Sequence, residues 1–202
     1  PVRQFVRDRD GWRERLVGFA EGRFFHGLGP AAAGEDAPEG AIRETCPEAQ
    51  GVIAALSGRL VAEGGALLAV DYGYAAPAFG DSVQAMAGHA FVDPLADPGE
   101  ADVTAHVDFA ALAAVARGAG AQAHPLLTQG TLLTRLGIGA RAAALARRHP
   151  ERAGDIRAAF DRLTGKGQGQ MGGLFKALAV TSPGLVPPAF DTPDALIDTV
   201  TA

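Results

Sequence analysis

The feature that most constrains this fold is a run of five apolar residues, Ala66–Val70, directly after a predicted helix. The helix is indicated by apolar residues that recur at helical spacing, namely Val52, Ile53, Leu56 and Leu60. Gly64 and Gly65 end it, because glycine adopts a left-handed C-cap at little cost. An apolar run without alternation is typical of a strand buried on both faces, as in a parallel sheet. Helix, glycine turn and buried strand form half of a βαβ unit, so we expect an α/β fold.

Two helix starts are indicated by capping residues. Thr45-Cys46-Pro47-Glu48 matches a capping box, with Thr45 as the N-cap and Glu48 reaching back to its amide. Asp108 is predicted to cap a second helix, which Gly118 and Gly120 end.

The rest of the chain alternates in the same way. Residues 1–30 are predicted to be β structure with a hairpin, and residues 31–40 a loop. Asp81–Phe91 could hold an edge strand, and Asp93–Asp102 is rich in turn residues. Three more helices are expected over Thr131–Leu136, Ala140–His149 and Glu151–Leu163. Further core strands are expected over Ala121–Thr128 and Leu174–Val180, with a proline-rich tail from Pro183.

Composition excludes several classes of protein. The 202 residues are 48% hydrophobic and carry a net charge of −5, so a globular domain without an electrostatic footprint for nucleic acid or a membrane surface is expected. No apolar run reaches the roughly 18–20 residues of a membrane span, and no signal-peptide pattern opens the chain. The single cysteine, Cys46, favours a reducing, cytoplasmic location. Since the chain opens inside a predicted strand, we expect it to be part of something longer.

Asp71 and Tyr72 are the first candidate site, because they follow the buried strand. In open α/β sheets, ligands bind beyond the carboxyl ends of the strands. A carboxylate and a phenol there could orient a polar substrate. The alternative is that Asp71 caps the following turn and Tyr72 packs.

His106 and Asp108 are the second candidate pair. A histidine two residues before an aspartate could be a base with its orienting partner, or two metal ligands. The alternative is stronger here, since Asp108 is already an N-cap. The acidic stretch Asp93–Asp102 lacks the spacing of an EF-hand and is interpreted as a solvated loop.

The glycine pairs near Gly27, Gly137 and Gly165 are interpreted as turns and caps. None follows a strong apolar strand and opens a helix, as a dinucleotide or P-loop site requires. The chain has no Gly-x-Ser-x-Gly elbow and no Cys-x-x-Cys pair, which lowers the expectation of common hydrolase or thiol chemistry.

Several segments, in this order and spacing, resemble the MidA family, the bacterial relatives of the mitochondrial complex I assembly methyltransferase. They are Glu44–Ala49, Ala69–Tyr74, Asp93–Phe109, Thr128–Gly130 and Met171–Lys176. The resemblance covers nearly the whole chain. One departure is Ala85-Met86-Ala87, where family members often carry a basic residue.

The resemblance implies the C-terminal half of a seven-stranded class I fold that uses S-adenosyl-L-methionine. Residues 1–44 would be a β-rich insertion after strand four, and residues 45–202 the C-terminal half of the methyltransferase domain. Ala66–Val70, Ala121–Thr128 and Leu174–Val180 would be strands five, six and seven. The family's glycine-rich cofactor loop would lie upstream of Pro1, so no cofactor-binding residue is assigned here.

The resemblance also implies a function, namely methylation of a protein, with arginine as the acceptor and this chain on the acceptor side. From position and residue type, the catalytic candidates are Asp71, Tyr72, His106 and Asp108, and the substrate-binding candidates are Glu44, Gly73 and Thr104. Expected partners are a protein substrate and either a second copy or a companion N-terminal half. The alternatives are a non-catalytic binding or assembly module and a metal-dependent hydrolase that uses His106 and Asp108.

Overall fold

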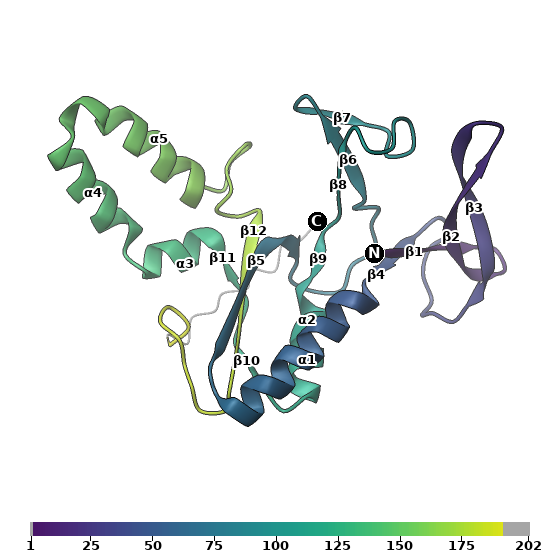
Figure 1. Ribbon diagram of the computed structural model, residues 1–202, viewed down its shortest axis with the longest axis horizontal. Coiled ribbons are helices and arrows are strands. Elements are labelled where there is room, and N and C mark those ends of the chain that lie inside the picture. Colours follow the sequence, from purple (N-terminus) through teal and green to yellow (C-terminus); the bar gives the residue numbers. More distant parts are fainter. Residues whose placement is uncertain (1, 192–202) are drawn as a thin grey trace. The chain divides into compact units, whose positions relative to one another are not determined.

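A computed structural model describes residues 2–191 (Figure 1). The chain forms two compact units, which we treat one at a time. The first comprises residues 2–50 and Pro77–His106, and the second comprises Gly51–Ala76 and residues 107–191. Helices and sheets are both present, so the predicted mixed α/β class is confirmed. The predicted domain boundary between residues 44 and 45 stays a prediction.

The first unit contains a four-stranded antiparallel sheet in the order β3-β2-β1-β4. Its strands are β1 (Arg3–Asp8), β2 (Gly11–Ala20), β3 (Arg23–Ala32) and β4 (Ile42–Thr45). The turn between β2 and β3 has positive φ at both Glu21 (51°) and Gly22 (78°), as a type I′ hairpin requires. The predicted hairpin is confirmed, whereas β4 was not predicted.

A second, three-stranded sheet of the same unit is ordered β7-β6-β8 and is antiparallel. It consists of β6 (Gln84–Ala87), β7 (Ala90–Val92) and β8 (Asp102–Thr104). The single edge strand expected within Asp81–Phe91 is therefore a hairpin, because Gly88 and His89 turn the chain with positive φ.

The sheet of the second unit is ordered β10-β12-β5-β9, and β11 also pairs with β12. Its strands are β5 (Ala66–Tyr74), β9 (Val107–Asp108), β10 (Gln122–Ala123), β11 (Leu127–Thr128) and β12 (Phe175–Thr181). The long neighbour of β5 is β12, which runs antiparallel to it; only the short β9 is parallel. The expectation of a parallel neighbour for β5 was wrong in this respect. The single strand expected over Ala121–Thr128 is two short strands, with Pro125 between them.

Two further expectations about β5 were wrong. The strand continues through Asp71 and Gly73 to Tyr74, because Asp71 and Tyr72 pair with β12 and Gly73 with β9. It is also not buried on both faces, since Leu68 is 53% and Val70 44% exposed. Within the described residues, the edge of β5 away from β12 pairs only at Gly73 and Tyr74. The side chains of the apolar run are therefore more exposed to solvent than its composition predicted.

Five α-helices lie in the described part of the chain: α1 (Pro47–Glu63), α2 (Phe109–Gly118), α3 (Gln129–Arg135), α4 (Ile138–Arg148) and α5 (Ala153–Thr164). A 3₁₀ turn, η1 (Pro150–Arg152), joins α4 to α5. The predicted capping box was wrong by one residue, because Thr45 belongs to β4 and the amide of Gln50 donates to the carbonyl of Cys46 at 3.2 Å. Pro47 then occupies the first helical position, where its missing N–H costs nothing.

One core cluster lies beside β12. It consists of Leu127, Leu132, Ala177, Ala179, Ala189 and Phe190. The predicted proline-rich tail thus packs into the core as far as Phe190, and residues 192–202 lie outside the described residues. No helix in residues 2–191 has the length and apolar character to cross a membrane.

Candidate functional site

The first group of candidate residues lies at the C-terminal end of β5, in the second unit. In the register of β5 and β12, Tyr72 stands opposite Phe175 and Asp71 opposite Lys176. The rings of Tyr72 and Phe175 meet edge to face, with centroids 5.5 Å apart. Residues directly opposite in a sheet share a face, so these two aromatic rings form a wall on one face of the strand end.

Asp108 shares that face with Tyr72. It pairs with Tyr74 in the β5–β9 ladder, and Tyr72 and Tyr74 point the same way because side chains alternate along a strand. The Oδ1 atom of Asp108 accepts a hydrogen bond from the amide of Ala111 at 2.9 Å, which confirms its predicted role as the N-cap of α2. Among the described residues, its other oxygen accepts no hydrogen bond. The cap therefore uses one of the two carboxylate oxygens.

Asp71 lies on the opposite face of the strand, by the same alternation. Its carboxylate is exposed, and its Oδ1 accepts from the amide of Tyr72 at 2.8 Å. The structure therefore brings Tyr72 and Asp108 to one face of β5 and separates Asp71 from them. The predicted group of acidic and phenolic side chains is not a single cluster.

Gly73 makes the β5–β9 pairing possible. A Cβ atom at this position would lie 2.0 Å from the carbonyl oxygen of Val107 and 2.8 Å from its amide nitrogen. Real Cβ contacts essentially never fall below 3.0 Å, so any side chain here would push β9 away. The glycine is accordingly the residue that lets Asp108 stand beside Tyr74.

Lys176 lies on the Asp71 face and is committed to the backbone. Its Nζ donates to the carbonyl oxygens of Gly173 at 2.5 Å and Leu174 at 3.1 Å. Burial lowers the pKa of Lys176 below its ordinary value. The ammonium thus fastens the glycine loop before β12 to the strand.

The second group of candidates lies in the first unit, where Glu44 is the centre of a hydrogen-bonded cluster. Its Oε1 accepts from Gln4 Nε2 at 2.7 Å and from the Ser82 amide at 3.0 Å, and its Oε2 accepts from the Ser82 hydroxyl. Gln4 and Ser82 are both buried. The carboxylate predicted to bind substrate is thus engaged by donors of the chain itself, and it ties β1 and β4 to the segment before β6.

Thr104 and His106 are the other two candidates in the first unit. Thr104 pairs with Gln84 in the β6–β8 ladder. The amide of His106 donates to the Ser82 hydroxyl at 2.9 Å. Ser82, a residue that the sequence did not single out, therefore joins Glu44 to His106, while Thr104 lies in the neighbouring β6–β8 ladder.

Asp81 extends the cluster to β2. Its Oδ1 accepts from Gln4 Nε2 at 2.7 Å, and its Oδ2 accepts from Arg15 Nη1 at 2.7 Å. Burial acts to raise the pKa of Asp81, but the hydrogen bonds from Arg15 and Gln4 outweigh it and leave that pKa below its usual value. No sequence pattern signalled Gln4, Asp81 or Ser82, because the bonds join residues 38 and 77 positions apart.

The described residues do not supply a recognisable cofactor cradle. Gly27 and Gly29 lie within β3, Gly137 lies directly before α4 and Gly139 in its first turn, and the glycines from Gly165 lie between α5 and β12. None of these loops leads from a strand into a helix, the arrangement in which backbone amides hold a dinucleotide or nucleotide phosphate. Across residues 2–191 there is also no group of three or more His, Cys, Asp or Glu side chains placed to hold a metal ion.

Comparison with known proteins identifies the family. A family model for S-adenosyl-L-methionine-dependent methyltransferases matches residues 1–127, more than half of the chain. The chain belongs to this family. The resemblance to the MidA family is thereby confirmed, since curated relatives are protein arginine methyltransferases named NDUFAF7.

Those relatives are much longer than this chain. The Mus musculus protein is 36% identical over 149 residues, which cover 70% of this chain and 34% of the relative. The Homo sapiens protein is 35% identical over 149 residues, which are 33% of its length. The chain thus spans about a third of the curated relatives that it matches. All of these relatives are named mitochondrial proteins, and this contradicts the predicted cytoplasmic location.

Two solved structures from Burkholderia thailandensis are similar to this chain over 95% of its length. One, an uncharacterized protein, has a TM-score of 0.82 at 29% identity, and the match covers 55% of that chain. The other is bound to S-adenosyl-homocysteine and has a TM-score of 0.78 at 27% identity over 51% of that chain. These likenesses confirm the predicted methyltransferase-type α/β fold.

Proposed function

We propose that this chain supplies the acceptor side of an S-adenosyl-L-methionine-dependent protein arginine methyltransferase. The single observation that carries the proposal is membership of the methyltransferase family over residues 1–127. Two further findings support it: the arginine methyltransferase relatives, and the similar structure that holds S-adenosyl-homocysteine, the product of methyl donation. A protein substrate, and a role in complex I assembly, are part of the same proposal.

The acceptor side of such an enzyme must hold the arginine side chain in place for methyl transfer. S-adenosyl-L-methionine supplies the methyl group, while the protein must align the acceptor nitrogen and manage its charge. A carboxylate that accepts bidentate or paired hydrogen bonds fixes a guanidinium in one plane and balances its charge. The second oxygen of Asp108, on the face of β5 that carries Tyr72 and Phe175, supports that role, since a guanidinium also stacks on aromatic faces.

The remaining candidates take different parts in this proposal. Asp71 offers a second exposed carboxylate on the other face of β5, and Gly73 keeps β9 in register. Glu44 is a positioning residue, because its oxygens already hold Gln4 and Ser82. His106 joins the same cluster through its amide bond to Ser82, and Thr104 pairs with Gln84 in the β6–β8 ladder. The cofactor side is contributed by further residues of the polypeptide or by a companion or second chain.

Transfer of tritium from methyl-labelled S-adenosyl-L-methionine tests the proposal. The polypeptide or complex that contains this chain is incubated with protein substrates and with arginine-containing peptides, beside matched peptides in which lysine replaces arginine. We expect label on the arginine nitrogens, identified as methylarginine after acid hydrolysis. Label on lysine alone would refute the arginine assignment, and absence of any transfer by preparations that bind S-adenosyl-homocysteine would refute the function.

A further inference from the structure

The helical hairpin of α4 and α5 is the least buried helical part of the second unit, since each of α1, α2 and α3 contains buried residues. Neither helix contains a buried residue, although both are amphipathic. In most amphipathic helices the apolar stripe faces a core. Here the stripe is only partly covered, and the hairpin lies beyond residue 127, where the family match ends.

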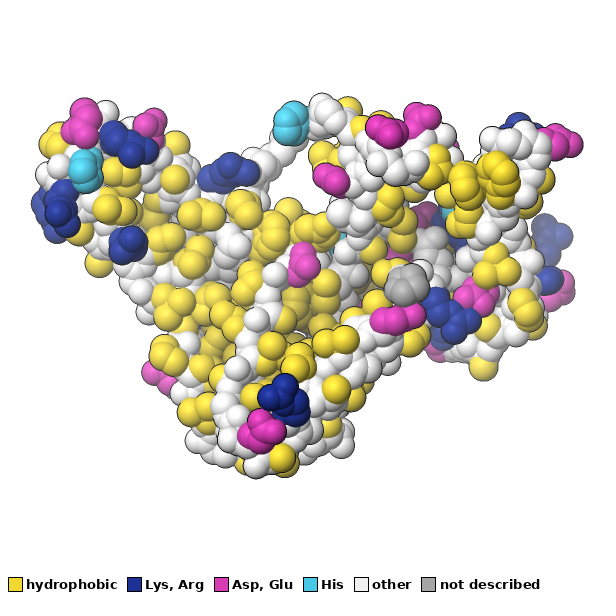
Figure 2. All heavy atoms as spheres, in the orientation of Figure 1, with side chains coloured by type: hydrophobic (Ala, Val, Ile, Leu, Met, Phe, Trp, Pro, Cys, Tyr) yellow, Lys and Arg dark blue, Asp and Glu magenta, His cyan; other side chains and the backbone are white. Residues whose placement is uncertain are grey.

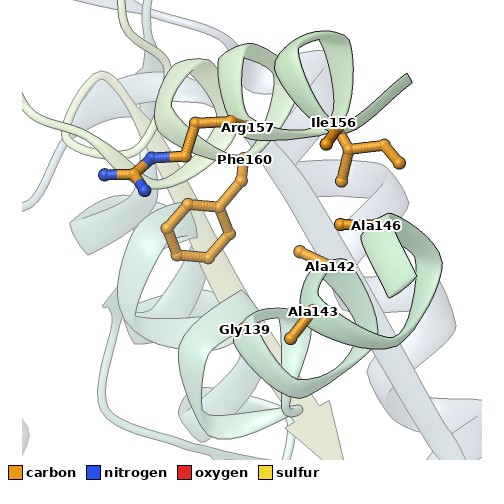
Figure 3. A pocket seen from close by; sticks show the side chains of 8 residues that line it. Gly139, Ala142, Ala143, Ala146, Ile156, Arg157 and Phe160 are labelled. Carbon is orange, nitrogen blue, oxygen red and sulfur yellow. The ribbon is translucent and has the colours of Figure 1, made fainter. Parts of the chain in front are cut away.

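An apolar groove runs between the two helices. Its volume is about 540 Å³, and Figure 3 shows small side chains from α4 facing larger ones from α5 across it. The residues that carry the argument are Ala142, Ala143, Ala146, Ile156, Arg157 and Phe160. Alanines on one wall leave room, while Ile156 and Phe160 provide an apolar surface, so the groove can accept large apolar side chains.

The hairpin is basic in a chain that is acidic. Residues 138–164 carry six arginines and three acidic residues, whereas the whole chain has a net charge of −5. Figure 2 shows Lys and Arg side chains beside hydrophobic ones over this hairpin. Arg157 lines the groove, and Arg147 follows Ala143 by one helical turn. In the described part of the chain, no carboxylate lies within ion-pair distance of Arg147, while Arg157 has an exposed pair with Asp161 at 3.4 Å.

We propose that the groove between α4 and α5 binds an amphipathic helix with acidic flanks, presented by a partner protein. Apolar side chains of that helix would fill the space over the alanines, and its carboxylates would pair with Arg147 and Arg157. The 11 residues of α4 make it roughly 16 Å long, so about three turns of the partner would be seated.

Charge and shape favour this occupant over two others. A second copy of the chain would bring the same net positive hairpin against this one, and like charges oppose such pairing. An anionic membrane attracts arginines too, but it accepts a protruding apolar face, whereas these side chains line a concave groove. A ridge of side chains on a helix matches the groove better. The proposal does not depend on the methyltransferase activity.

Fluorescence anisotropy with a labelled designed peptide tests the proposal. The probe is an amidated helical peptide of about four turns, with leucines at positions i, i+3, i+4 and i+7 and glutamates on both flanks. A second peptide carries lysine in place of every glutamate, and a third carries serine in place of every leucine. All three are titrated with the 202-residue chain.

We expect saturable binding of the acidic probe and at least tenfold weaker binding of both control peptides. The double variant R147E/R157E should weaken the acidic probe at least tenfold, about 1.4 kcal/mol, and improve the lysine peptide. R148E is the matched control: Arg148 lies on the same helix but, at 100° per residue, on the face away from Ala142 and Ala146, so its effect should stay below twofold. Circular dichroism confirms that each variant keeps its helices.

Three results would overturn the proposal. The first is equal binding of the acidic and lysine peptides, and the second is equal loss for R147E/R157E and R148E. The third is absence of probe binding together with either retention of the chain on phosphatidylserine vesicles or self-association in sedimentation, when the double variant abolishes that retention or self-association. The last outcome would assign the groove to a membrane or to a second copy.

Discussion

Replacing Gly73 by alanine should destabilise the protein, because the new Cβ atom would collide with backbone atoms of Val107, which cannot rotate away as a side chain can. In G73A the new Cβ would stand 2.0 Å from the Val107 carbonyl oxygen, whereas ordinary contact begins at 3.4 Å. The shortfall of 1.4 Å can be relieved only by separating β9 from β5, where just two residue pairs hold them together. Two lost hydrogen bonds cost about 2 kcal/mol and residual strain about 1 kcal/mol more, so we expect a loss of about 3 kcal/mol.

Urea unfolding followed by circular dichroism at the helical band measures this loss, because nearly all described helical residues lie in the second unit. The matched control is G58A in α1, where a Cβ would meet nothing within 4 Å. Alanine favours helix over glycine by up to about 1 kcal/mol, so this variant should be slightly more stable than the wild type. If G73A unfolds within 0.5 kcal/mol of the wild type, roughly the scatter of a neutral surface change, the inferred role of Gly73 is wrong.

Three further predictions concern the carboxylates of both units. E44Q should lose about 2 kcal/mol of stability in urea unfolding, because the amide NH2 that replaces Oε2 cannot accept from the Ser82 hydroxyl and the remaining oxygen is an uncharged acceptor. E63Q on the surface of α1 should change the stability by less than about 0.5 kcal/mol. The pKa of Asp81 is lowered in the folded protein, so its ion pair stabilises the fold above pH 3.8 and this stabilisation is lost as the pH falls through the folded-state pKa. When the free energy of unfolding is measured against pH, D81N should lose less stability in acid than the wild type. An identical acid-induced loss in both proteins would contradict this prediction. D108A should destabilise α2 by about 1 kcal/mol while D108N, which still caps, should not, as thermal melts would show; equal losses would argue against the cap.

Local sequence patterns predicted much of the fold. The periodicity before Ala66, the capping residue Asp108 and the glycine stops located α1 and α2 to within a few residues, because these signals act over a single turn. Patterns did not reveal β4, whose four residues are largely polar and become a strand only by pairing with β1. They also misjudged where β5 ends, since pairing with β12 and β9 extends it through a sequence that resembles a turn.

The candidate site was less predictable, for a related reason. Sequence order placed Asp71 and Tyr72 side by side, yet strand alternation sends them to opposite faces, and only the register with β9 brings Asp108 to the Tyr72 face. The Glu44 cluster depends on Gln4, Asp81 and Ser82, which are distant in sequence and individually unremarkable. The resemblance indicated the family and the chemistry, whereas the side-chain partners depend on strand register and on contacts between distant segments.

If the Tyr72 face of β5 holds the methyl acceptor, as we propose, variants on that face should change the kinetics of methyl transfer. Methyl transfer to an arginine substrate is measured for the polypeptide or complex that contains this chain, with D108N, Y72F and, as the control in the exposed loop, D97N. D108N keeps the helix cap and removes only the charge, so we expect kcat/KM to fall at least tenfold, about 1.4 kcal/mol, with a smaller loss in Y72F and none in D97N. Wild-type rates in a correctly folded D108N protein would show that the acceptor binds elsewhere.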